Sequence, residues 1–134
     1  MAGYSSRPLI DKLGIKPNTR IAIINAPRGY RTTLGALPPG VRVVSTIRGS
    51  FPFIQFFARS RALLRTTIAK LVGALEPDGA LWVSWPKKAA GVPSDMSEDA
   101  VREMAFPLGL VDIKVAAVDD VWSGLKLVRR LRNR

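Results

Sequence analysis

Few residues in this sequence could do chemistry, because it contains neither histidine nor cysteine. Their absence excludes the usual zinc sites, cysteine and serine–histidine nucleophiles, and the commonest general base. Asp95, Asp119 and Asp120 remain as acids in predicted loops. We expect Asp95 to cap its own helix, with Glu98 completing a capping box, and the pair Asp119 and Asp120 to shape a turn. The sequence therefore predicts no catalytic residue and no metal site.

A second set of side chains directly follows the predicted strands. In open α/β sheets, ligands bind outside the carboxyl ends of parallel strands, so these positions are the candidate ligand-binding residues. Arg59 and Ser60 also precede a predicted helix, whose N-terminal N–H groups favour an anion. The complete candidate set is Asn25, Pro27, Arg28 and Gly29 after the first strand, Arg59 and Ser60 after the third, Trp85, Lys87 and Lys88 after the fourth, and Trp122 in the last loop.

Aromatic residues offer a further possibility. Trp82 and Trp85 share one predicted strand, and we expect both indoles on one face, packed beneath a helix. Alternatively, Trp85 and Trp122 present their rings to a planar ligand or base. An RNA-stacking platform is a weaker interpretation than a buried strand for the phenylalanines at 51, 53, 56 and 57.

Strands alternating with helices must position these residues. Apolar runs predict strands at 21–24, 41–46, 53–57, 80–85, 111–118 and 125–128, with breakers at Gly49 and Pro52 before the third. Helices are expected from a Ser6 cap to Leu13, at 30–34, at 61–75, and from Asp95 to Gly109, with a turn at 76–79. The last two strands lie too close together for a helical crossover, so they must form an antiparallel hairpin. This pattern predicts a three-layer, Rossmann-like α/β sandwich with a mainly parallel six-stranded sheet.

Length and composition indicate one globular domain. The chain has 134 residues, of which 47% are hydrophobic and 23% charged. We expect a single domain spanning 1–134, with a helical leader at 1–14 and a basic tail at 129–134. No apolar segment is long enough for a membrane span and no secretory signal is present, so a cytoplasmic bacterial protein is expected.

The charge is distributed unevenly. The net charge is +11, from 21 basic and 10 acidic residues. All of this excess lies in residues 1–75, where Asp11 is the one acid. Such an asymmetry predicts an anionic partner, which could be a nucleic acid, a phosphate-bearing ligand or an acidic protein surface. The alternative is a highly solvated surface with no partner.

The order of elements resembles the fold of the class I S-adenosylmethionine methyltransferases. The strings LGIKPNTR before the first strand, LVGALEPDGALWVSW and AFPLGLVDIKV carry this resemblance. It implies the strand order 2-1-3-4-6-5 and the loss of one strand–helix unit between Val41 and Phe51. The strings KLGIKP, WVSWPKK, PLGLVDIKVAAVDD and WSGLKLV also resemble a family of small bacterial proteins classed as a domain of unknown function.

The cofactor-binding positions depart from the methyltransferase pattern. Those enzymes hold the methionine end of the cofactor on a glycine-rich turn, whereas the turn at 25–29 retains only Gly29, and Pro27 lacks an N–H. They also end the second strand with an acid that accepts the ribose hydroxyls, and no acid lies at 45–48. The resemblance therefore implies a degraded site that disfavours S-adenosylmethionine.

These observations leave three functional hypotheses. The leading one is a non-catalytic, methyltransferase-like domain that binds an anionic partner or nucleotide-type ligand at the carboxyl edge of its sheet. The first alternative is a small methyltransferase with an atypical cofactor loop, in which Asn25, Arg28 and Trp85 replace the missing contacts. The second is a sequence-tolerant nucleic-acid binder, which requires one basic face formed by Arg28, Arg31, Arg59, Arg61, Arg65 and Lys70.

Overall fold

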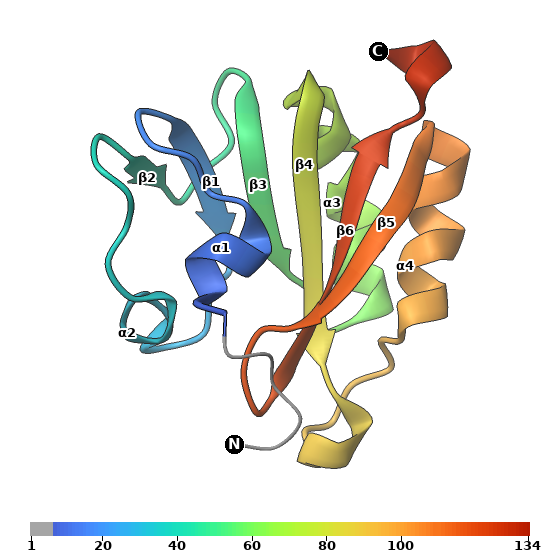
Figure 1. Ribbon diagram of the computed structural model, residues 1–134. Coiled ribbons are helices and arrows are strands. Elements are labelled where there is room, and N and C mark those ends of the chain that lie inside the picture. The colour runs from blue at the N-terminus through green and yellow to red at the C-terminus, as the bar shows by residue number, and fades with distance from the viewer. Residues whose placement is uncertain (1–6) are drawn as a thin grey trace.

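The computed structural model describes residues 7–134, which form one six-stranded mixed sheet flanked by helices on both faces (Figure 1). The strands lie in the order β2-β1-β3-β4-β6-β5. The first four are parallel, and β6 runs antiparallel to both β4 and β5. The predicted fold class, strand order and C-terminal hairpin are confirmed. The strands are β1 (Arg20–Ile24), β2 (Arg42–Val44), β3 (Phe51–Phe57), β4 (Leu75–Pro86), β5 (Leu110–Ala117) and β6 (Trp122–Arg129).

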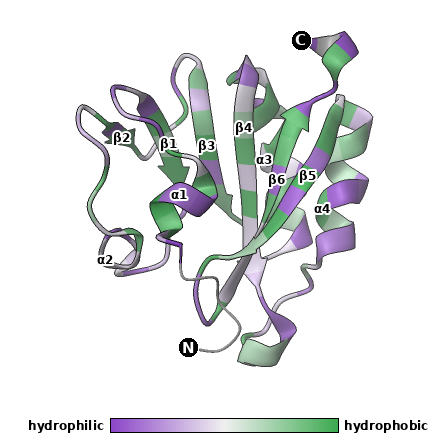
Figure 2. Ribbon diagram, in the orientation of Figure 1, coloured by the Kyte–Doolittle hydropathy of each residue, from purple (hydrophilic) through white to green (hydrophobic). Residues whose placement is uncertain are grey.

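The helices form the two outer layers of the sandwich. The short helices α1 (Leu9–Leu13) and α2 (Tyr30–Leu34) cover one face, and α3 (Arg61–Gly73) and α4 (Glu98–Ala105) cover the other (Figure 1). Leu64, Ile68 and Leu71 recur at spacings of four and three, so one side of α3 packs on the sheet. Figure 2 shows hydrophobic and hydrophilic residues alternating along α1 and α4, as expected for helices that cover a sheet. Single 3₁₀ turns occur at Lys88–Ala90, Phe106–Leu108 and Leu131–Asn133.

Strand β4 is longer than predicted. The expected turn at 76–79 lies within it as an irregularity, since Phe51 pairs with Leu75 but Phe53 pairs with Ala80. The amide of Phe51 donates to the carbonyl of Ala74 at 2.8 Å, so the chain joins the sheet as soon as α3 ends. Pro52, predicted as a breaker before the third strand, lies inside β3, where its missing N–H falls at this shift in register.

The prediction that both tryptophans of β4 lie on one face is wrong. Trp82 packs on the α1–α2 side and donates its indole N–H to the carbonyl of Leu13 at 3.0 Å. Trp85 packs on the α3–α4 side. The two residues are three positions apart, and side chains in a strand alternate with a period of two, so an odd spacing separates them.

The remaining predicted connections are short. A six-residue loop at 45–50 joins β2 to β3 without a helix, which agrees with the predicted loss of one strand–helix unit. The first helix ends at Leu13, as predicted, with Gly14 in the left-handed conformation, while the predicted cap Ser6 lies outside the described residues. Within residues 7–134, every helix is too short or too polar to cross a membrane.

Candidate functional site

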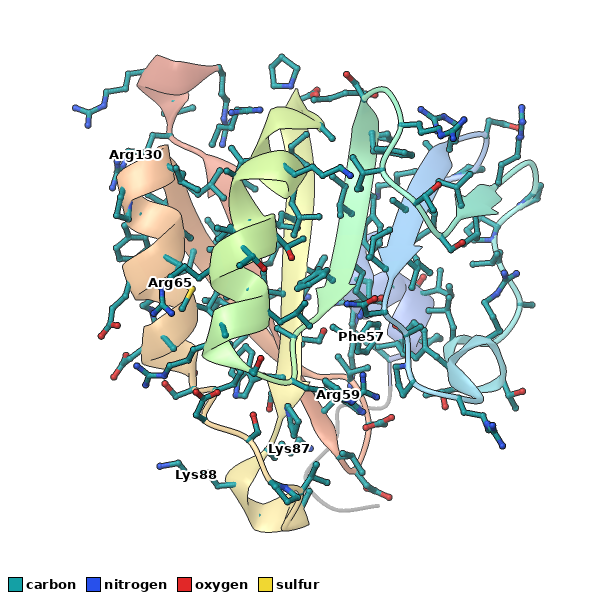
Figure 3. All side chains as sticks on the ribbon, turned by 180° about the vertical axis from the view of Figure 1, so that it is seen from behind. Phe57, Arg59, Arg65, Lys87, Lys88 and Arg130 are labelled. Carbon is teal, nitrogen blue, oxygen red and sulfur yellow. The ribbon has the colours of Figure 1, made fainter. Side chains whose placement is uncertain are left out.

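The candidate residues gather where the parallel strands end. The loops after β1, β3 and β4 meet the β5–β6 loop at the carboxyl edge of the sheet, and Figure 3 shows Phe57, Arg59 and Lys87 at this end, with Lys88 further out. Asn25, Arg28, Gly29, Arg59 and Lys88 are exposed. The other candidates are half-buried (Pro27, Ser60 and Lys87) or buried (Trp85 and Trp122).

The turn after β1 retains left-handed backbone geometry despite its single glycine. Asn25 has φ of 60° and Gly29 has φ of 81°, and Gly29 directly precedes α2. Asparagine tolerates this region better than most side chains, so it takes a conformation that glycine usually supplies. The turn at 25–29 thus has two residues in the left-handed region although it contains one glycine.

A buried polar network anchors that turn to the sheet. The Tyr30 hydroxyl donates to Gln55 Oε1 at 2.7 Å, and Gln55 Nε2 donates to Ser84 Oγ at 3.3 Å. Burial raises the pKa of Tyr30 well above its ordinary value, so its hydroxyl remains a donor. The network joins α2, β3 and β4. Sequence reasoning missed it, although Gln55 is the one polar side chain in the apolar run at 51–57.

Arg59 lies over an aromatic cluster. Its guanidinium carbon is 5.0 Å from the centroid of the Trp122 ring, and Trp122 contacts Phe57 edge-on with ring centroids 5.1 Å apart. Trp122 and Trp85 are only 5% and 6% exposed, so neither indole forms an open stacking surface. The arrangement instead holds an exposed cation, Arg59, beside the end of β3.

The β5–β6 loop is tied to the end of β4. One carboxylate oxygen of Asp119 accepts the amides of Val121 and Trp122 at 2.8 Å each, which confirms the turn role predicted for Asp119. Lys87 reaches this loop twice, with Nζ on the carbonyl of Asp119 and its amide on the carbonyl of Val121, both at 2.7 Å. These bonds fix the lysine that follows β4.

Asp95 does not cap its own helix, so that prediction is wrong. Ser97 is the N-cap of α4 and accepts the amide of Ala100 at 3.1 Å, so α4 begins later than predicted. Asp95 instead accepts the amide of Arg61 at 2.8 Å, and its carbonyl accepts from Arg61 Nε. The negative charge expected at the N-terminus of α3 is thus supplied by the chain itself, beside the N-cap Ser60.

Replacing Asp95 by alanine should therefore destabilise α3 rather than α4. We expect a loss of about 1 kcal/mol in the free energy of unfolding, because a charged acceptor at a helix N-terminus is removed. Urea denaturation measures this, with the exposed Asp78→Ala as the matched charge control. Equal stability of the two variants would contradict the assigned role.

The basic residues of the first half lie at both ends of the sheet. Arg59 follows β3, whereas Lys70 lies in the last turn of α3, which meets the start of β3 through Ala74. Lys70 is therefore separated from Arg59 by the length of α3, and the nucleic-acid hypothesis, which requires these side chains on one face, stays a prediction.

Solved structures with the same architecture identify the fold. The N-methyltransferase NodS from Bradyrhizobium japonicum superposes with a TM-score of 0.61 at 13% identity, over 90% of this chain and 92% of that one. A TehB-like SAM-dependent methyltransferase from Corynebacterium glutamicum gives 0.58 at 15%, over 96% and 91%. The ribosomal protein L11 methylase from Lactobacillus delbrueckii gives 0.60 at 13%, over 91% and 75%. This is the class I methyltransferase fold. No protein-family model and no curated protein sequence matches the chain, so the resemblance to the small bacterial family stays a prediction.

The methyltransferase fold places its switch point between β1 and β3, because β2 pairs on the opposite side of β1. The left-handed turn at 25–29 lies there and fits the backbone role of a cofactor-binding turn. The end of β2 fits less well. Its following residues, Ser45 and Thr46, are exposed and offer hydroxyls where an acid would contact a ribose.

Proposed function

We propose that this chain binds S-adenosylmethionine at the carboxyl edge of β1 and β3 and acts as a small methyltransferase. The observation that carries the proposal is the left-handed turn of Asn25 and Gly29 at the switch point of a methyltransferase fold. Each compared structure is described as a methyltransferase or methylase. This supports the methyltransferase hypothesis over the non-catalytic domain that the sequence alone favoured.

In this proposal the chain's own residues orient the ligand. S-adenosylmethionine supplies an electrophilic methyl group when it is bound. The turn at 25–29 would approach its methionine end, with Arg28 and Arg59 available to its carboxylate. Ser45 and Thr46 would hydrogen-bond the ribose in place of an acid. The buried Tyr30 network would hold the turn in position.

A non-catalytic domain that binds an anionic, nucleotide-type ligand is the second candidate. The charge of the edge favours it, since Arg28, Arg59 and Lys88 are all exposed there. The hydroxyls at the end of β2 carry no negative charge. A cationic ligand is disfavoured in such surroundings, whereas a diphosphate is favoured.

Calorimetry with S-adenosylmethionine, S-adenosylhomocysteine and ADP tests both candidates. S-adenosylmethionine carries a net charge of about +1 at neutral pH, and S-adenosylhomocysteine carries none. We therefore expect the homocysteine compound to bind roughly five- to tenfold more tightly, because the edge is basic. Arg59→Gln should reduce the difference in affinity between the two compounds. Arg42→Gln, at the other end of the sheet, should leave that difference unchanged.

The ranking of the three ligands distinguishes the candidates. ADP binding more tightly than both adenosyl compounds would favour the non-catalytic domain. Failure of all three ligands to bind would contradict both candidates.

A further inference from the structure

Two lysines meet on the face of the sheet beside α1, away from the carboxyl edge, and the charge of a third, Lys16, acts on one of them. Lys114 on β5 and Lys126 on β6 are directly opposite partners across the hairpin. Lys114 Nζ donates to the carbonyl of Lys12 at 3.0 Å, and a Cβ placed on Gly14 would lie 3.8 Å from Lys126 Nζ. Both ammonium groups therefore reach the end of α1, which lies in front of the sheet in Figure 1. Lys16 follows in the next loop.

This arrangement is electrostatically unfavourable without a counter-charge. Like charges directly opposite each other in a β-ladder destabilise it. Burial, followed by the positive charges of Lys114 and Lys16, lowers the pKa of Lys126 below its ordinary value. Trp82, opposite Lys126 on β4, is uncharged, and α1 contributes Lys12 together with the exposed Asp11.

The nearest acid of β5 is engaged elsewhere. Asp112 bonds Arg102 of α4, so it belongs to the opposite face of the sheet. The three ion pairs of Arg102, with Glu98, Asp99 and Asp112, include none of these lysines. Lys114 and Lys126 therefore lie opposite each other within reach of the positive charge of Lys16, and neither takes part in the ion pairs of Arg102.

We propose that Lys16, Lys114 and Lys126 form a binding site for a multivalent phosphate group, separate from the carboxyl-edge site. Lysine ammonium groups bind phosphate as point charges and donate to several of its oxygens. One phosphate contacting all three would relieve the repulsion between Lys114 and Lys126. Lys126 lies opposite Trp82 on β4, a residue whose indole holds the end of α1, so the site is built on rigid elements.

Titration with inorganic pyrophosphate at low salt tests the proposal. We expect wild-type protein to bind it, and Lys126→Met to reduce the affinity by about tenfold. Lys16→Gln changes an exposed loop residue and should also weaken binding, so the test does not depend on a single variant. Lys70→Met, on the exposed side of α3, removes the same charge and should change the affinity by less than about twofold.

A polynucleotide backbone presents the same phosphate chemistry, so a second titration uses single-stranded oligouridylate. If pyrophosphate displaces bound oligouridylate, the proposed site exists and the phosphate groups that it binds can belong to a polynucleotide. If pyrophosphate binds but oligouridylate does not, the proposed site exists and its ligand is a small phosphate compound. The proposal is overturned if pyrophosphate does not bind at about millimolar concentration, or if Lys126→Met and Lys16→Gln bind it as tightly as wild type.

Discussion

Replacing Trp82 by alanine is expected to lower the free energy of unfolding by about 3–5 kcal/mol, because a large buried ring is lost from a site that cannot fully collapse. Trp82 is 0% exposed. Its indole holds α1 through the carbonyl of Leu13, and a Cβ placed on Gly124 would lie 3.0 Å from its ring. The side chain thus fills the space between α1 and the hairpin. Urea denaturation at constant m value measures the loss.

Trp82→Phe is the control for this prediction. It retains most of the apolar volume but removes the indole donor, so its expected cost is well under half that of the alanine variant. A loss below about 1 kcal/mol for Trp82→Ala would mean that α1 is not anchored by this residue.

The second large effect is expected at Gln55, which is also 0% exposed. Gln55→Leu leaves the Tyr30 hydroxyl and the Ser84 hydroxyl without their shared partner. Each buried unpaired group costs about 1–3 kcal/mol, so the two hydroxyls together are expected to cost about 2–6 kcal/mol. Denaturation at neutral pH measures it, and ligand affinity at the carboxyl edge should fall as well because the turn at 25–29 is no longer anchored.

A double variant separates lost hydrogen bonds from lost packing. Replacing Tyr30 by phenylalanine in the Gln55→Leu background removes the orphaned hydroxyl, so the double variant should be more stable than Gln55→Leu alone. If the losses in the free energy of unfolding of the two single variants simply added in the double variant, the hydrogen bond between Tyr30 and Gln55 would not explain the loss in Gln55→Leu.

Much of the fold could be predicted from local patterns. The apolar run at 21–24, the four-three spacing in α3 and the short loop before Trp122 each define an element or a connection without reference to distant residues. The stub helix at Tyr30–Leu34 and the hairpin followed from breakers and loop length in the same way. The strand order required the resemblance, because local patterns do not say which strands pair.

The errors have physical causes. Asp95 accepts a hydrogen bond from the amide of Arg61, which is 34 residues away. The capping-box pattern could not reveal this contact because it compares only residues that are close in sequence. The irregularity at the start of β4 arises from pairing with β3, which a Pro-Gly turn signal does not include. The carboxyl-edge positions were predicted from a general rule on strand ends, whereas the network of Tyr30, Gln55 and Ser84 depends on contacts 25 and 29 residues apart.

Backbone amide NMR of the labelled chain during titration with S-adenosylhomocysteine tests the central claim most directly, because it reports where the ligand binds. Binding at the carboxyl edge predicts shifts for Asn25, Arg28, Gly29 and Arg59, with little change at Lys126. Gln55→Leu should weaken these shifts. A titration that leaves the amides after β1 and β3 unchanged, or that moves only residues of β5 and β6, would contradict the account.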